Sequence, residues 1–110
     1  MNGTQTLSEN IADVAGLAVA YDGWRASLGG GTAPEVGGFT GPQQFFLSYS
    51  QSWLIKWREP ALRQAVITDG HAPGEYRADA VRNLDAWYEA FDVKPGRRLY
   101  LTPDQRVRVW

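Results

Sequence analysis

Apolar positions in the first quarter of the chain recur at helical spacing. The residues that recur three and four positions apart are Leu7, Ile11, Val14, Ala15, Ala18 and Tyr21. This pattern predicts an amphipathic helix over residues 6–28, ended by the glycine run at 29–31. Gly16 and Gly23 lie inside the helix, and a helix that keeps such glycines is expected to have another element packed closely against it.

Aromatic side chains dominate the next apolar segment, which predicts a second helix over residues 42–57. Thr40 is suited to cap this helix and Pro42 to its first turn, where a missing N–H group leaves no bond unmade. The aromatic stripe of the helix consists of Phe45, Phe46, Tyr49, Trp53 and Trp57. Such a stripe forms part of a core or docks on another part of a larger protein, and the pattern leaves both open.

Two further helices and an irregular tail complete the prediction. A proline at position 60 interrupts the pattern, a shorter helix follows over residues 61–68, and a longer one over 76–91. The apolar stripe of this last helix consists of Val81, Leu84, Tyr88 and Phe91. After a turn at 94–96 the chain alternates, which predicts an extended segment near its end. The predicted fold class is therefore mainly α, in one unit without an internal repeat.

Composition and charge exclude several classes of function. The chain has 110 residues, with 11 Lys and Arg against 12 Asp and Glu, and a net charge of −1 provides no field for nucleic acid. It has no cysteine for a disulfide or a thiolate metal site, and no apolar stretch approaches the about 20 residues of a membrane span. The glycine-rich loop at 29–41 lacks the Gly-Lys-Ser/Thr sequence of a phosphate cradle. Five Trp, five Tyr and four Phe are more than so short a chain readily buries, which indicates a partner surface.

Two carboxylates, Glu9 and Asp13, lie four residues apart and hence on one face of the first predicted helix. Like charges at this spacing repel, so a nearby cation would explain the pair. A carboxylate oxygen can ligate Zn²⁺, and a second carboxylate can orient an imidazole ligand. The alternative is structural, because Thr6 and Glu9 fit a capping box and acids in a first turn suit the helix dipole. Spacing alone leaves both interpretations open.

The single histidine, His71, lies in a Gly/Pro-rich loop at residues 69–74. Loops of this kind often carry catalytic groups. One histidine cannot supply the usual three protein ligands of a catalytic zinc ion, and no Ser-His-Asp order is apparent around it. Arg77 follows near the predicted start of a helix, where the dipole disfavours a cation, so we expect it to have an anionic or carbonyl partner. An ordinary surface histidine and arginine are the alternative.

Four segments match, in order, the motifs of one enzyme family. Residues 2–13 look like its Asn-Gly-x-x-Thr-Leu-x-Glu-Asn-Ile-Ala-Asp signature, and residues 44–53 resemble its aromatic helix. Residues 69–77 resemble its Asp-x-His-x-Pro-x-x-Phe/Tyr-Arg element, and Arg108-Val109-Trp110 is similar to its terminal Arg-Val-Trp. The family is that of neprilysin and endothelin-converting enzyme, which are zinc metallopeptidases. The resemblance implies that residues 1–110 are the C-terminal portion of a zincin-type catalytic domain.

The resemblance also implies a role for each candidate residue. Glu9 would be the third zinc ligand, and Asp13 would hydrogen-bond a zinc-ligating histidine. His71 would donate to the oxyanion of the tetrahedral intermediate. Arg77 would hold a backbone carbonyl of the peptide substrate, and Asp69 would support the site.

The chain departs from the family in what it lacks. The His-Glu-x-x-His helix, which supplies two zinc ligands and the general base, has no counterpart in this sequence. The resemblance therefore implies a zinc cofactor and a peptide substrate for the complete enzyme, and we expect the isolated chain to be inactive, to bind zinc weakly at most and to self-associate. The lack of cysteine favours a bacterial member, and the family favours a periplasmic or extracellular location. A free-standing helical interaction module is the alternative from another class.

Overall fold

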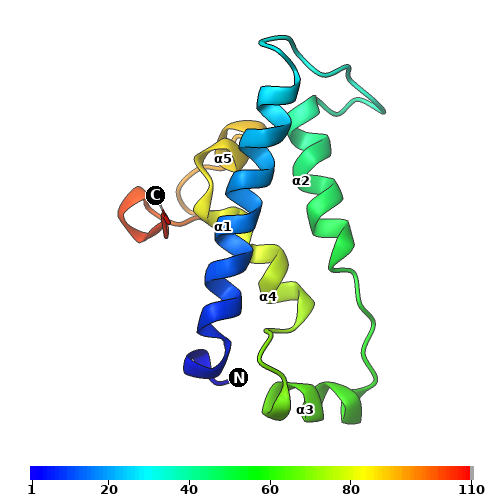
Figure 1. The fold of residues 1–110 in the computed structure, drawn as a ribbon, viewed down its shortest axis with the longest axis vertical. Helices are drawn as coiled ribbons and strands as arrows, with labels where there is room; N and C mark the ends of the chain where they lie inside the picture. The colour runs from blue at the N-terminus through cyan, green and yellow to red at the C-terminus, as the bar shows by residue number, and fades with distance from the viewer. Residues whose placement is uncertain (110) are drawn as a thin grey trace.

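The computed structural model describes residues 1–109, and Figure 1 shows an all-helical chain built along one long helix. The elements are α1 (Gly3–Ser27), α2 (Gly41–Ser52), α3 (Glu59–Thr68), α4 (Gly74–Ala78), the 3₁₀ helix η1 (Asp79–Asn83), α5 (Asp85–Phe91) and the 3₁₀ helix η2 (Pro103–Gln105). Helix α2 runs beside the C-terminal half of α1, while α4 lies beside its N-terminal half (Figure 1). The mainly α fold class is thus confirmed.

Helix α1 begins three residues earlier than its apolar pattern predicts. Asn2 is the N-cap, and its Oδ1 accepts a hydrogen bond from the Thr4 N–H at 3.1 Å. The expected capping box is wrong, because Thr6 lies inside the helix with only 2% of its surface exposed. The close packing expected at Gly16 and Gly23 is also wrong, since a Cβ placed on either would have nothing within 4 Å.

The core lies where α1, α2 and η1–α5 meet. Its buried apolar residues are Val14, Leu17, Phe46, Ala80 and Val81. Tyr21 of α1 stacks on Phe46 with 5.1 Å between ring centroids and meets Phe45 edge-on at 5.2 Å. The aromatic stripe of α2 therefore serves mainly as core. Leu7 and Ile11 were expected on the same stripe of α1 as Val14, but they are 55% and 43% exposed because nothing covers the N-terminal end of that face.

Helix α2 ends at Ser52, five residues before the predicted end. The Trp53 N–H bonds to the Ser50 carbonyl at 3.2 Å, a tighter turn that closes the helix. The predicted cap is confirmed, since Thr40 and Gln43 form a capping box and Pro42 lies in the first turn. Trp57 therefore lies on the linker to α3 rather than on the stripe, and it is 40% exposed.

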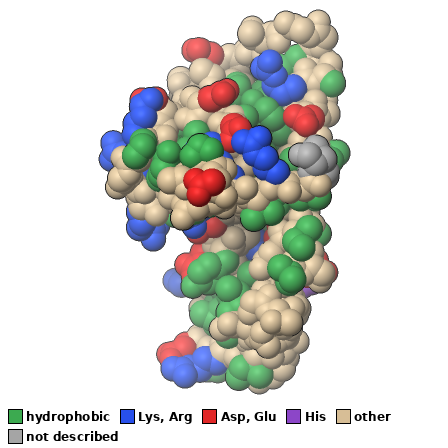
Figure 2. Space-filling view, turned by 90° about the vertical axis from the view of Figure 1, so that its left-hand side faces the viewer, with side chains coloured by type: hydrophobic (Ala, Val, Ile, Leu, Met, Phe, Trp, Pro, Cys, Tyr) green, Lys and Arg blue, Asp and Glu red, His purple; other side chains and the backbone are tan. Residues whose placement is uncertain are grey.

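The linker and α3 form an arm that contributes nothing to the core. Helix α3 has no buried residue, and Figure 1 shows it at the far end of the molecule from the α1–α2 loop. Leu54, on the linker, is 81% exposed, and Ile67, near the end of α3, is 70% exposed. Figure 2 shows apolar side chains exposed between groups of charged side chains on one face of the molecule.

The helix predicted over 76–91 is wrong as one element. It divides into α4, η1 and α5, because Leu84 takes an extended backbone with φ −100° and ψ 121° between η1 and α5. This break turns α5 back so that it packs on α2, and Leu84 still reaches the core.

The tail after α5 is held by one tyrosine and one arginine. The Tyr88 hydroxyl donates to the Arg82 carbonyl at 2.8 Å and accepts from the Leu101 N–H at 3.0 Å. Arg106 stacks over the Tyr88 ring at 3.6 Å and pairs with Asp85 at 2.6 Å. After η2 the chain is not helical, but no strand forms within residues 1–109, and Trp110 of the terminal motif lies outside the described residues.

Candidate functional site

Four of the residues singled out from the sequence lie together, although the contacts that join them connect residues more than 60 positions apart in the chain. Glu9 and Asp13 project from the first half of α1, His71 lies in the loop between α3 and α4, and Arg77 lies on α4. The 3.3 Å contact between Glu9 and His71 and the 2.7 Å contact between Asp13 and Arg77 join the two segments. The helix and the loop thus form one side of a common site.

The imidazole of His71 lies between two carboxylates. Its Nε2 is 3.3 Å from Glu9 Oε2, and its Nδ1 is 2.8 Å from Asp69 Oδ1. Asp69 Oδ1 also accepts the His71 backbone N–H at 2.9 Å, which closes a tight local turn. Hydrogen bonds from the His71 backbone and ring lower the pKa of Asp69. Because an ionised carboxylate only accepts, Asp69 orients the ring so that Nε2 faces Glu9.

Asp13 and Arg77 make a two-pronged ion pair. Arg77 Nε donates to Asp13 Oδ2 at 2.8 Å, and Nη2 donates to Oδ1 at 2.7 Å. Both side chains are well covered, with 19% exposure for the arginine and 11% for the aspartate. The hydrogen bond to Asp13 raises the pKa of Arg77, so the guanidinium is always charged.

These contacts answer both expectations about charge. A cation was expected beside the carboxylate pair, and the Arg77 guanidinium lies beside Asp13. An anionic or carbonyl partner was expected for Arg77, and that partner is Asp13. The helix-dipole argument about Arg77 is wrong, because α4 is so short that Arg77 lies in its last turn, where a cation is favoured.

The start of α1 also holds the histidine loop. Gln5 Nε2 donates to the Asp69 carbonyl at 2.9 Å, across 64 positions of sequence. Buried Thr6 accepts a hydrogen bond from Asn10 Nδ2 at 3.2 Å, on the turn that carries Glu9. Sequence reasoning did not single out Gln5, and no local pattern distinguishes it from an ordinary exposed glutamine.

The described residues do not form a metal site by themselves. Among residues 1–109 no group of three or more His, Cys, Asp or Glu side chains is arranged to hold a metal ion. Catalytic zinc usually takes three protein ligands. The Nε2 atom of the single histidine faces the Glu9 carboxylate, so these two groups do not point together at a common position for a metal ion. The Glu9 side chain is 42% exposed, so its carboxylate could also meet a group outside the described residues.

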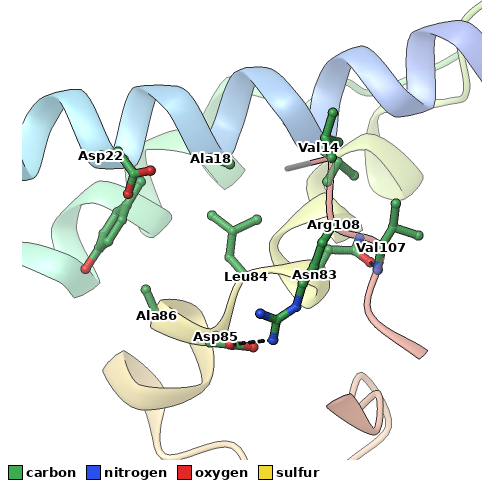
Figure 3. Close-up of a pocket in the computed structure, with 11 residues that line it drawn as sticks. Val14, Ala18, Asp22, Asn83, Leu84, Asp85, Ala86, Val107 and Arg108 are labelled. Atoms are coloured by element: carbon green, nitrogen blue, oxygen red, sulfur yellow. Dashed lines mark hydrogen bonds and ion pairs between the residues drawn. The ribbon is translucent and has the colours of Figure 1, made fainter. Parts of the chain in front are cut away.

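A separate hollow of about 290 Å³ lies between α1, the η1–α5 junction and the tail (Figure 3). Val14 lines it from α1 and Leu84 from the η1–α5 junction, and the Asp85–Arg108 ion pair also borders it (Figure 3). It contains none of the four clustered residues, so it is distinct from the candidate site.

Comparison with known proteins identifies relatives over the full length of the chain. The model of peptidase family M13 matches residues 1–107. The neutral endopeptidase of Lactobacillus helveticus is 36% identical over 111 residues, and the endothelin-converting enzyme 1 of Bos taurus is 33% identical over 114. Each alignment covers 100% of this chain but only 16% and 15% of the relative. The chain thus spans about a sixth of the length of the curated relatives it matches.

A solved structure shows the same fold. The zinc metalloprotease Zmp1 of Mycobacterium tuberculosis, in its open state, aligns with a TM-score of 0.94 and 41% identity. The alignment covers 98% of this chain and 17% of that one. A second structure of Zmp1, in complex with an inhibitor, gives the same TM-score.

None of the helices described in residues 1–109 combines the length and the hydropathy needed to cross a membrane.

Proposed function

The chain belongs to peptidase family M13, and on that premise we propose that residues 1–110 form the C-terminal portion of a zinc metalloendopeptidase catalytic domain that hydrolyses peptides. The His-Glu-x-x-His helix of such a domain would be supplied by polypeptide that is not in this sequence. When bound, zinc would supply Lewis-acid polarisation of the scissile carbonyl.

Glu9 is proposed as one zinc ligand, contributed from α1. Its carboxylate is exposed enough to meet groups outside the chain, and α1 is a long helix that holds it firmly. Asp13, one turn later on the same face, would accept a hydrogen bond from a ligand histidine. Its two oxygens already accept from Arg77, but each carboxylate oxygen has a further lone pair.

His71 and Arg77 are proposed to act on the peptide. The Nε2 of His71 faces the same space as the Glu9 carboxylate. Because Nδ1 donates to Asp69, Nε2 carries a hydrogen in the imidazolium form, and in that form it would donate to oxygen charge that develops on the scissile carbonyl. Arg77 uses Nε and Nη2 on Asp13, and its Nη1 makes no hydrogen bond within residues 1–109. This group would hold a backbone carbonyl of the substrate.

The observation that carries the proposal is the convergence of α1 and the 69–77 segment. The contacts 9–71, 13–77 and 5–69 each join residues more than 60 positions apart. If the two carboxylates were unrelated surface groups, there would be no reason for a histidine, a half-buried arginine and a glutamine from distant positions to meet them. A free-standing interaction module would account for the exposed apolar arm but not for this cluster.

A chimera tests the proposal. This chain replaces the matching segment of Zmp1, to which it is 41% identical, and peptide hydrolysis is measured with and without a chelator. We expect chelator-sensitive hydrolysis that His71→Gln lowers by about a hundred- to a thousand-fold, the effect of one lost oxyanion donor. Arg63→Gln, on the exposed face of α3, is the matched control and should leave the rate unchanged. Full activity in the His71→Gln chimera would contradict the assigned role.

A further inference from the structure

The last turn of α2 meets α4 at two points through one residue, Trp53. A Cβ placed on Gly74 would lie 2.6 Å from the Trp53 carbonyl oxygen, so the two backbones are in contact. One turn further along α4, the Arg77 guanidinium lies over the Trp53 ring, with 4.0 Å from Cζ to the ring centroid. The backbone of Trp53 thus contacts the start of α4, and its ring contacts the guanidinium end of the Arg77 side chain.

Tyr49, one turn earlier in α2, holds the same arginine from its other end. Its hydroxyl donates to the Arg77 backbone carbonyl at 3.0 Å. Its ring meets the Trp53 ring edge-on, with 5.9 Å between centroids and 75° between planes. Burial raises the pKa of Tyr49, and the nearby Asp13 carboxylate raises it further, so the hydroxyl remains a donor at neutral pH.

The guanidinium is therefore held along one edge and covered on one face. Asp13 holds the edge that carries Nε and Nη2, Trp53 covers a face, and Nη1 is left to point out of the pair. The indole Nε1–H of Trp53 is buried and has no hydrogen-bond partner within the described residues. Burying an unpaired N–H is unfavourable. The ring contacts both Arg77 and Tyr49 there.

From this arrangement we propose that Trp53 is a positioning residue that sets the direction in which Arg77 presents its free N–H groups to a peptide carbonyl. Tyr49 assists by fixing the main chain of Arg77. The inference rests on the proposed substrate role of Arg77, but the contact itself is tested without substrate or metal.

The experiment measures solvent exchange of the Arg77 Nε–H by NMR in the ¹⁵N-labelled chain. Trp53→Leu removes the π face and should speed exchange by roughly 3- to 30-fold, the factor that a lost cation–π contact corresponds to. Trp53→Phe keeps an aromatic face and should stay within about threefold of native. Trp57→Leu is the matched control, because Trp57 lies on the exposed linker, and it should match the native rate.

A ring-fluorinated tryptophan placed at position 53 keeps the volume and withdraws the π electrons. Because the volume is unchanged, this variant separates the effect of the π face on Arg77 from the effect of packing. It is the deciding variant if the circular dichroism of Trp53→Leu shows that this variant is no longer natively folded. Faster exchange with fluorination supports the inference. Exchange unchanged by fluorination, or equal in Trp53→Leu and Trp57→Leu, overturns it. Either result leaves the proposed function standing, whereas an inactive chimera would remove the substrate role and leave the measured contact intact.

Discussion

At the scale of single residues, the site depends on charges that reach each other only after folding. Sequence reasoning identified Glu9, Asp13, His71 and Arg77 and expected a cation near the acids and an anion near the arginine. It could not pair Asp13 with Arg77, because the pairing depends on how α4 lies on α1. Gln5 had no signal in the sequence, and Trp53 was expected only as part of the aromatic stripe, because the contacts of both residues with the 69–77 segment form only in the folded chain.

Breaking the Asp13–Arg77 ion pair is expected to lower the free energy of unfolding. Asp13→Asn keeps the shape but removes the charge from a pair whose members are 11% and 19% exposed. We expect the free energy of unfolding to fall by about 1–3 kcal/mol, because a largely covered guanidinium loses its charged acceptor. Urea unfolding followed by circular dichroism measures it. The control is Asp22→Asn, an exposed position on the same helix, which should change stability by less than about 0.5 kcal/mol. Equal effects of the two variants would show that the pair contributes nothing specific.

The ion pairs of Asp85 are expected to stabilise the fold at neutral pH and to lose this effect in acid. The hydrogen bond from Arg106, together with the charge of Arg108, lowers the pKa of Asp85 below its unfolded value of about 3.9. The stabilisation is therefore fully present above about pH 4 and is lost as the pH falls through the folded-state pKa. Because Asp85 is 49% exposed, we expect less than about 1 kcal/mol.

The measurement compares urea unfolding of the native chain and Asp85→Asn at pH 7 and pH 2.5. The native chain should be the more stable at pH 7, and the difference should shrink at pH 2.5. Asp22→Asn controls for general acid effects, since Asp22 is exposed on α1 and forms no ion pair within the described residues. A difference that is the same at both pH values would contradict the assignment.

At the scale of elements, apolar spacing predicted where helices occur better than where they end. The pattern located α1 to within three residues at its start, because a 25-residue helix contains many repeats of the signal. It failed at 76–91, where the same spacing of apolar residues continues through a break at Leu84. It failed also at 53–57, where two tryptophans four apart belong to different elements, one in contact with α4 and one on the linker. Both failures lie where tertiary contacts decide the path of the chain.

The contact between α2 and α4 predicts an effect of a single methyl group. Gly74→Ala would place a Cβ 2.6 Å from the Trp53 carbonyl, so the backbones must separate. We expect a loss of about 1–3 kcal/mol in the free energy of unfolding, the usual cost of overpacking. The matched control is Gly70→Ala in the same loop, where a Cβ would have nothing within 4 Å and which should be nearly neutral or slightly stabilising. Thermal unfolding of both variants decides it, and a neutral Gly74→Ala would show that the close approach is not required.

At the scale of the whole molecule, the chain has more surface than an independent domain of its mass. Its accessible surface is 7500 Å², against about 6,100 Å² for a monomeric protein of 12.2 kDa. Its radius of gyration is 15.4 Å, where about 13 Å is typical of this length. The excess, roughly 1,400 Å², resembles the area that one partner buries in a large interface. The exposed arm of residues 54–68 accounts for part of it.

This surplus surface predicts that the isolated chain self-associates. Exposed apolar side chains on the arm, among them the adjacent Leu54 and Ile55, would be covered by a second copy. We expect the weight-average mass from light scattering to rise with concentration and Leu54→Ser with Ile55→Ser to reduce the rise. Val36→Ser, on the loop between α1 and α2, is the control for exposed apolar side chains elsewhere. A strict monomer at every concentration would contradict the prediction.

Under the proposed function, α1 and the 69–77 segment would present Glu9 to a metal whose other ligands lie on the rest of an M13 peptidase. Zinc content of the Zmp1 chimera, measured by atomic emission after dialysis, tests it most directly. We predict one zinc per chimera with the native chain and with Glu35→Gln, an exposed glutamate in the 29–41 loop, and a loss of zinc with Glu9→Gln. Zinc retained equally in all three proteins, at equal circular dichroism, would contradict the account.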